Sequence, residues 1–166
     1  MNSVQIHLAL THVPVILCLV GLVMLITASI LKNNTLIKAS YFLIIFAGIF
    51  TAPVYLSGEG AEEAVERLAG VSETIIEAHE EAAELAMILM VAAALAALGA
   101  LFSSRWAGAA RIAKMIVLVL ALATGGFMVQ TAHLGGQIRH SEIRNEVVLK
   151  GDASGIDMVK NHQDDE

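Results

Sequence analysis

The sequence predicts an all-α fold: an integral membrane bundle whose four helices run up, down, up and down and whose outer loop carries an acidic helix. Hydrophobic residues make up 57% of the chain, and its mean hydropathy of +0.72 is far above that of a water-soluble domain of this size. Four apolar stretches are each long enough to cross a bilayer, which takes about 20 residues. We expect one transmembrane domain, 1–136, followed by a polar tail, 137–166.

The four predicted spans cover residues 5–31, 36–57, 82–102 and 110–135. The connections after the first and third spans, KNNTLIK and SSRWAGAAR, are short, so each joins antiparallel neighbours. The second connection is long and acidic. Within it, Thr74-x-x-Glu77 has the pattern of a capping box and opens a helix that continues into the third span. Gly135-Gly136 is typical of the C-terminal end of a helix.

Charged residues are distributed unevenly between the two ends of the predicted bundle. All sixteen acidic residues fall on the side that holds both termini and the second connection. The opposite side has no acidic residue and five basic ones: Lys32, Lys38, Arg105, Arg111 and Lys114. Under the positive-inside rule, the basic side faces the cytoplasm. We therefore expect a multi-pass protein of the bacterial cytoplasmic (inner) membrane, with both termini on the outer, periplasmic side.

Four histidines lie at the predicted outer ends of three different helices: His7, His12, His79 and His133. At about 1.5 Å of helix per residue, His12 and His133 each lie about 30 Å from the basic residues at the opposite ends of their helices. On the same scale, His7 and His79 form a second level slightly further out. Histidine within a membrane usually faces the bundle interior and marks a functional site. The convergence of these histidines at one end therefore predicts a binding site there.

A b-type haem is the cofactor that this cluster favours first. Low-spin haem b takes two neutral imidazoles from facing helices. Either His12 with His133 or His7 with His79 could supply them. The chain has a single cysteine, Cys18, and no C-x-x-C-H motif, so the haem would be held without covalent attachment.

Three further residues belong to the predicted haem site. Gln130 and Gly126 lie on the same helical face as His133, where they offer an amide and a bare backbone against which a flat macrocycle can rest. Arg139 follows the last span, near the place where the propionates of the macrocycle would emerge.

Other ligands and roles fit the same histidines. A divalent transition metal would combine them with nearby glutamates, although the Glu-x-x-His spacing of di-iron bundles is absent because position 76 is isoleucine. A proton relay would need no cofactor, but the inner halves of all four spans are apolar and do not continue it. A non-redox membrane subunit or scaffold would use the histidines to hydrogen-bond helix ends.

Two motifs resemble those of a bacterial family of small four-helix membrane proteins, catalogued as a domain of unknown function, number twenty-two thirty-one. IHLALTHVPVILCL resembles the family's opening His-Pro-x-x-Val-His-Phe-Pro-Ile motif, with Leu8 and Val13 as departures, and TAHLGGQIRHSEI resembles its closing Gly-His-x-Gly-Gly motif. The resemblance extends over residues 1–141 and implies a four-helix membrane protein with an outward histidine cluster. It matches the following histidines to the family: His7, His12, His79, His133 and His140.

Electron transfer is the function that these features favour, between quinol in the bilayer and an outer-side, periplasmic redox protein. The acidic outer connection would attract a basic partner, and the apolar spans contact membrane lipids. The sequence has no hydrolytic or transferase motif, so any enzymatic role would be that of a redox component. No nucleic-acid partner is expected. A homo-oligomer and a subunit of a larger membrane complex are both compatible with the sequence.

Overall fold

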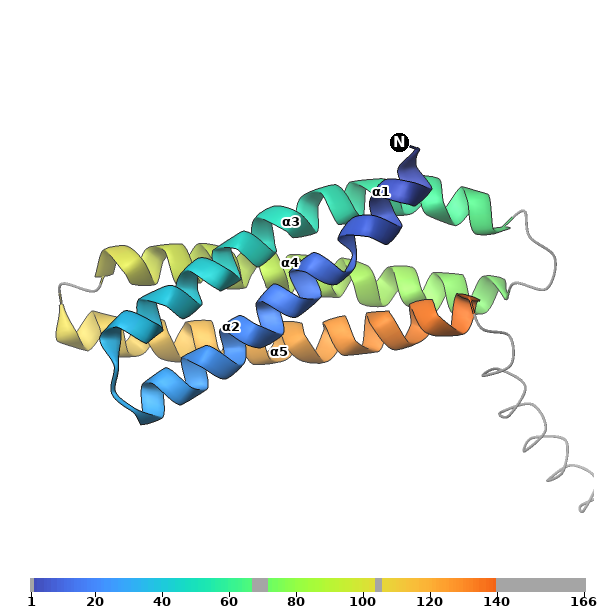
Figure 1. Ribbon diagram of the computed structural model, residues 1–166. Coiled ribbons are helices and arrows are strands. Elements are labelled where there is room, and N and C mark those ends of the chain that lie inside the picture. Colours follow the sequence, from blue (N-terminus) through green and yellow to red (C-terminus); the bar gives the residue numbers. More distant parts are fainter. Residues whose placement is uncertain (1, 67–71, 104–105, 140–166) are drawn as a thin grey trace, which may run out of the picture.

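The computed structural model describes residues 2–66, 72–103 and 106–139, which form helices and no strand (Figure 1). The helices are α1 (Ser3–Leu10), α2 (His12–Ile30), α3 (Asn34–Glu66), α4 (Glu73–Ser103) and α5 (Ala107–Arg139). The predicted all-α bundle is confirmed. Residues 140–166 of the predicted tail lie outside the described part of the chain.

Four helical lengths run along the bundle. α1 and α2 together form the first length, and α3, α4 and α5 form the other three; each is long and apolar enough to cross a membrane. α2 packs against α3 and α5, and α4 packs against the same two helices, so the four lengths close into a bundle. α1 begins, α3 ends, α4 begins and α5 ends at one end of this bundle, which we call the outer end (Figure 1).

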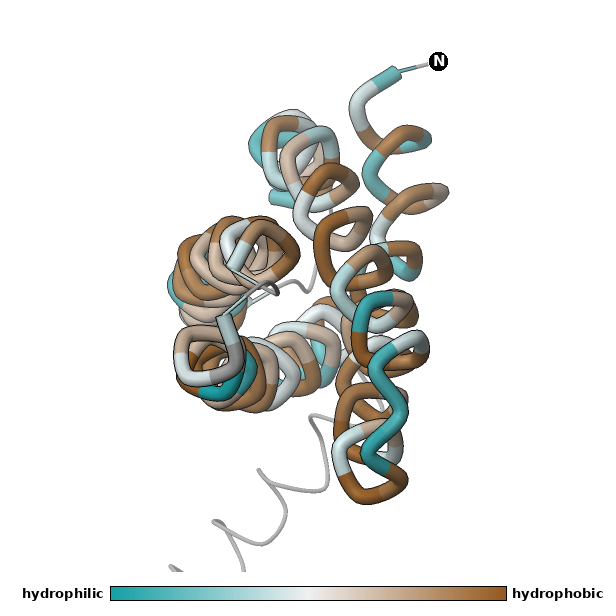
Figure 2. Tube along the Cα trace, turned by 90° about the vertical axis from the view of Figure 1, so that its left-hand side faces the viewer, coloured by the Kyte–Doolittle hydropathy of each residue, from teal (hydrophilic) through white to brown (hydrophobic). Residues whose placement is uncertain are grey.

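Hydrophobic residues cover the outward faces of the helices as well as the interior (Figure 2). Large apolar side chains on all four lengths are more than half exposed, including Val23, Phe46, Leu95 and Leu122. A helix that is hydrophobic on every face is suited to a protein interior or to lipid. Lipid contact around the bundle is therefore the environment that this surface fits.

The bundle interior is built largely from small side chains. Ala93 and Ala97 of α4 are completely buried, as is Ala47 of α3. At Gly48 of α3, an added Cβ would lie only 2.6 Å from Cβ of Ala94. Small residues of this kind let membrane helices approach closely and gain van der Waals contact, because lipid itself provides no hydrophobic driving force between them.

Thr11 separates α1 from α2 within the first predicted span, although its own backbone angles are helical (φ −52°, ψ −38°). Pro14 has no N–H to donate to the carbonyl of Leu10, and its ring crowds that turn. The backbone N–H of Thr11 donates to the carbonyl oxygen of His7, at 2.9 Å, and the Thr11 hydroxyl donates to the same oxygen. α1, like α2, packs against α3, where Gly60 allows a close approach to Ser3.

Three helices extend further at the outer end than the apolar stretches predict. α3 continues to Glu66 instead of ending at residue 57. α4 begins at Glu73, so Thr74 lies within its first turn and the prediction that Thr74 caps the helix is wrong. The acidic residues of the second connection that the structure describes thus lie mostly on these two extensions. α5 runs through Gly135 and Gly136 to Arg139, so the prediction that this glycine pair ends the helix is wrong.

Candidate cofactor site at the outer end

His7 of α1 lies against α3. Its Nδ1 is 3.0 Å from the carbonyl oxygen of Val54, and its ring is partly buried. Gly58, four residues after Val54, faces the same ring: an added Cβ there would lie 3.7 Å from Cε1 of His7. Residues four apart share a helical face, so Gly58 and the Val54 carbonyl lie on the same side of α3, toward the ring.

His79 of α4 lies against α5 in a closely similar way. Its Nδ1 is 2.9 Å from the carbonyl oxygen of Thr131, and its ring is also partly buried. Gly135, again four residues after the accepting carbonyl, faces the ring, and an added Cβ there would lie 3.1 Å from Cε1 of His79. Each histidine therefore hydrogen-bonds a backbone carbonyl of a neighbouring helix and rests on the glycine one turn further along.

These two hydrogen bonds determine which ring nitrogen carries the proton. A carbonyl oxygen only accepts hydrogen bonds, so Nδ1 of His7 and Nδ1 of His79 must both be donors. In a neutral imidazole the other nitrogen, Nε2, then keeps its lone pair. Histidines that bind metals commonly have this arrangement, in which a carbonyl fixes the tautomer and the orientation of the ring.

His7 and His79 lie at the same end of the bundle on different helices: His7 of α1 is held against α3, and His79 of α4 is held against α5.

His12 and His133 are placed differently, because both side chains are exposed on the outside of the bundle. Nε2 of His133 is 3.0 Å from the amide nitrogen of Gln137, one turn along α5. Gly125 of α5 packs against Leu19 of α2. His12 is seven residues from Leu19, and His133 is eight residues from Gly125 in the antiparallel helix. The two histidines therefore lie at depths along the bundle that differ by less than one helical turn.

The remaining residues of the predicted site lie on the outward face of α5 or at its end. Gly126 and Gln130 are exposed, and an added Cβ at Gly126 would meet nothing within 4 Å. Arg139 is the last residue of α5, and its side chain lies outside the described part of the structure, as does all of His140. The predicted stripe of Gly126, Gln130 and His133 thus faces away from the pair formed by His7 and His79.

Metal ions other than haem iron usually need more ligands than two imidazoles. Among residues 2–66, 72–103 and 106–139, no three His, Cys, Asp or Glu side chains are grouped as a metal-ion site. The acidic extensions do meet, because Glu62 of α3 and Glu80 of α4 are close enough for their charges to repel. The divalent-metal alternative stays a prediction.

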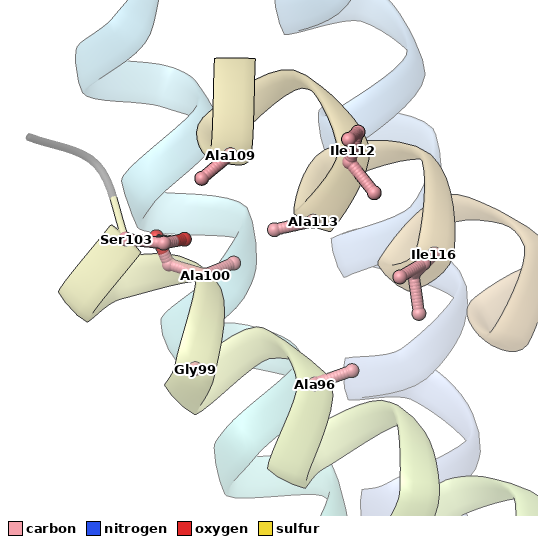
Figure 3. A pocket seen from close by; sticks show the side chains of 8 residues that line it. All are labelled: Ala96, Gly99, Ala100, Ser103, Ala109, Ile112, Ala113 and Ile116. Carbon is pink, nitrogen blue, oxygen red and sulfur yellow. Dashed lines mark hydrogen bonds between the residues drawn. The ribbon is translucent and has the colours of Figure 1, made fainter. Parts of the chain in front are cut away.

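A cavity of about 380 Å³ lies between α4 and α5 at the opposite end of the bundle (Figure 3). Ala96, Gly99 and Ala113 are among the residues that line it, with the hydroxyl of Ser103 as the polar side chain. No histidine contributes to its wall. This cavity is therefore separate from the cluster at the outer end and offers no ligand for iron.

No family model, curated protein or solved structure matches the chain. The resemblance of its two motifs to a known family stays a prediction. The candidate site accordingly rests on the chemistry and geometry of the chain's own residues.

Sequence reasoning did not find every residue of the arrangement. Gly58 and the carbonyls of Val54 and Thr131 were not among the expected site residues. Backbone carbonyls leave no mark in a sequence, whereas Gly58 and Gly135 do. One pattern in the sequence could have indicated Gly58 and Gly135: each is a glycine at the same depth as a histidine on a neighbouring helix.

Proposed function

We propose that the protein binds one b-type haem at the outer end of the bundle, with His7 and His79 as the axial ligands, and that it transfers electrons. The observation that carries the proposal is the matched pair of Nδ1–H to carbonyl hydrogen bonds, which leaves Nε2 of both rings available. The rings come from different helices, α1 and α4, at the same end of the bundle. Two such imidazoles are what a low-spin b-type haem requires.

A haem held in this way supplies a centre that gains and loses one electron at a time. Coordination by both His7 and His79 would occupy the iron, which would favour electron transfer over reaction with oxygen. The residues of the chain hold and orient the ligands: α3 fixes the ring of His7 through Val54, and α5 fixes the ring of His79 through Thr131.

The position of the site suggests its redox partners. The site lies at one end of helices that are apolar enough to cross a membrane, and a quinol dissolved in the bilayer would meet the protein there. Acidic residues of α3 and α4, including Glu62 and Glu80, lie at the same end and would attract a basic redox protein from the aqueous side. The partners proposed are therefore a quinol and a periplasmic redox protein.

We also propose that this end faces the periplasm of the bacterial inner membrane, because Lys32, Lys38, Arg111 and Lys114 lie at the other end. In a Cys18→Ala background, an impermeant maleimide applied to intact spheroplasts should label a cysteine introduced at Ser72 and spare one introduced at Asn33. The reverse labelling would contradict this orientation.

The test of haem binding is an optical titration of the full chain in mild detergent. Protein from haem-sufficient cells, or apoprotein titrated with haemin, should show a low-spin Soret band that saturates at one haem per chain. Carbon monoxide should leave the reduced spectrum essentially unchanged, because both axial positions are filled. A colourless protein that also fails to take up added haemin would refute the proposal.

One competing function uses the same two hydrogen bonds. As a scaffold without a cofactor, the protein would use His7 to tie α1 to α3 and His79 to tie α4 to α5. The two functions differ in their need for Nε2: haem binding requires it as the atom that coordinates iron, whereas the scaffold uses only Nδ1. Variants that keep the Nδ1-type donor and remove Nε2 therefore distinguish them.

A further inference from the structure

Gly135 stands out among the glycines near the histidine pair. An added Cβ there would lie 3.1 Å from Cε1, 3.4 Å from Nδ1 and 3.9 Å from Nε2 of His79. The shortest of these distances is tighter than nearly all contacts made by real Cβ atoms. A side chain at position 135 would therefore have to push the imidazole away from α5 by a few tenths of an ångström.

The imidazole of His79 has little freedom to yield. Its Nδ1 is held 2.9 Å from the carbonyl oxygen of Thr131, on the same helical face as Gly135. The helices α4 and α5 pack against each other along their length, which fixes the backbone on both sides of the contact. A displaced ring would have to lengthen or bend its hydrogen bond and turn Nε2 to a new direction.

The other glycines of this end do not impose the same constraint. An added Cβ at Gly58 would lie 3.7 Å from Cε1 of His7, which is an ordinary van der Waals distance. An added Cβ at Gly136 would meet nothing within 4 Å. Gly136 is the neighbour of Gly135 in the same helix, so a methyl group there has a similar effect on helix propensity without touching the ring.

We infer that Gly135 is a positioning residue for a haem ligand: the bare backbone at this position sets the orientation of His79, and through it the strength of the bond from Nε2 to iron. The inference rests on the proposed function. Groups that orient a metal ligand typically change metal affinity by about 10–100-fold when they are altered, and they shift the redox potential. The same sensitivity is expected here from a single methyl group.

The experiment compares Gly135→Ala with Gly136→Ala in the full-length chain in mild detergent. The measurements are the rate of haem loss to excess apomyoglobin, the midpoint potential from a spectroscopic redox titration, and the low-spin fraction. Gly135→Ala should release haem at least about tenfold faster, with a shifted potential and a smaller low-spin fraction. Gly136→Ala should resemble the wild type in all three measurements, because an added Cβ there meets nothing within 4 Å.

The possible outcomes separate this inference from the proposed function. A wild-type protein that binds no haem overturns both. A haem-binding wild type with Gly135→Ala indistinguishable from Gly136→Ala overturns the inference alone. Circular dichroism and maleimide reactivity of the buried Cys18 report on folding. If Gly135→Ala loses helical content or exposes Cys18, position 135 is structural and the positioning role is refuted.

Discussion

Replacing His79 with alanine is expected to abolish the low-spin haem spectrum and to weaken haem binding by more than about 100-fold, and His7→Ala should do the same. Loss of an axial ligand removes a bond to iron, so its effect should exceed the 10–100-fold produced by altering a group that only orients a ligand. The haem that remains should be high-spin and should bind carbon monoxide when reduced. Haem titration and optical spectroscopy of the purified variants provide the measurement.

Two sets of variants serve as controls for this result. His79→Asn places an amide donor near the position of Nδ1 and removes Nε2, so it should keep the fold and still lose low-spin haem. His12→Ala and His133→Ala should retain the wild-type spectrum, because both side chains are exposed and lie outside the pair. Loss of the spectrum in His12→Ala or His133→Ala, with His79→Ala unaffected, would assign the ligands to the other level of histidines.

Gly48→Ala is expected to destabilise the bundle by about 1–3 kcal/mol, the range for overpacking a closely packed interior. The added methyl carbon would lie 2.6 Å from Cβ of Ala94, and both atoms are attached directly to backbone, so α3 and α4 would have to separate. Unfolding of the full chain in mixed micelles with increasing sodium dodecyl sulfate, followed by circular dichroism, measures the change.

The matched control for Gly48 is Gly99→Ala, since an added Cβ at Gly99 meets nothing within 4 Å. That variant should change stability by no more than about 0.5 kcal/mol. Combining Gly48→Ala with Ala94→Gly should recover most of the loss by restoring the space between the helices. Equal stability of Gly48→Ala and Gly99→Ala would show that α3 and α4 do not approach as closely as the structure indicates.

The helical bundle could be predicted from the sequence because the thickness of the bilayer sets the length of an apolar membrane-spanning helix. A span needs about 20 apolar residues, and the short connections leave antiparallel packing as the arrangement. Pro14 removes a backbone hydrogen bond one turn earlier, which the sequence shows, but what α1 packs against could not be predicted from it. Glycines of α3, including Gly60, provide that contact.

The ends of the helices depended on tertiary packing that local patterns do not contain. Gly135-Gly136 resembles a helix end, yet α5 continues to Arg139. α4 extends outward to Glu73 beside it, and His79 of that extension packs on Gly135. A glycine pair commonly ends a helix because glycine readily adopts the left-handed conformation of the turn that follows. Here the contacts with α4 stabilise a helical backbone at Gly135 and Gly136 instead.

The sequence could place the histidines by depth and could not fix their directions. Depth follows from counting residues along a helix, and it separated His7 and His79 from His12 and His133. Whether a ring faces a neighbour depends on the rotation and tilt of its helix, which arise from packing. In the structure His7 and His79 are partly buried and hydrogen-bonded to neighbouring helices, whereas His12 and His133 are exposed, so the haem proposal now specifies one pair.

The most direct test of this pairing is chemical rescue of His79→Gly with free imidazole. We predict that the variant alone has high-spin haem or none, and that added imidazole restores a low-spin spectrum close to that of the wild type, with half-saturation in the millimolar range typical of weak small ligands, about 1 mM. A His79→Gly protein that keeps a wild-type low-spin spectrum without imidazole would contradict the assignment of His79 as a ligand.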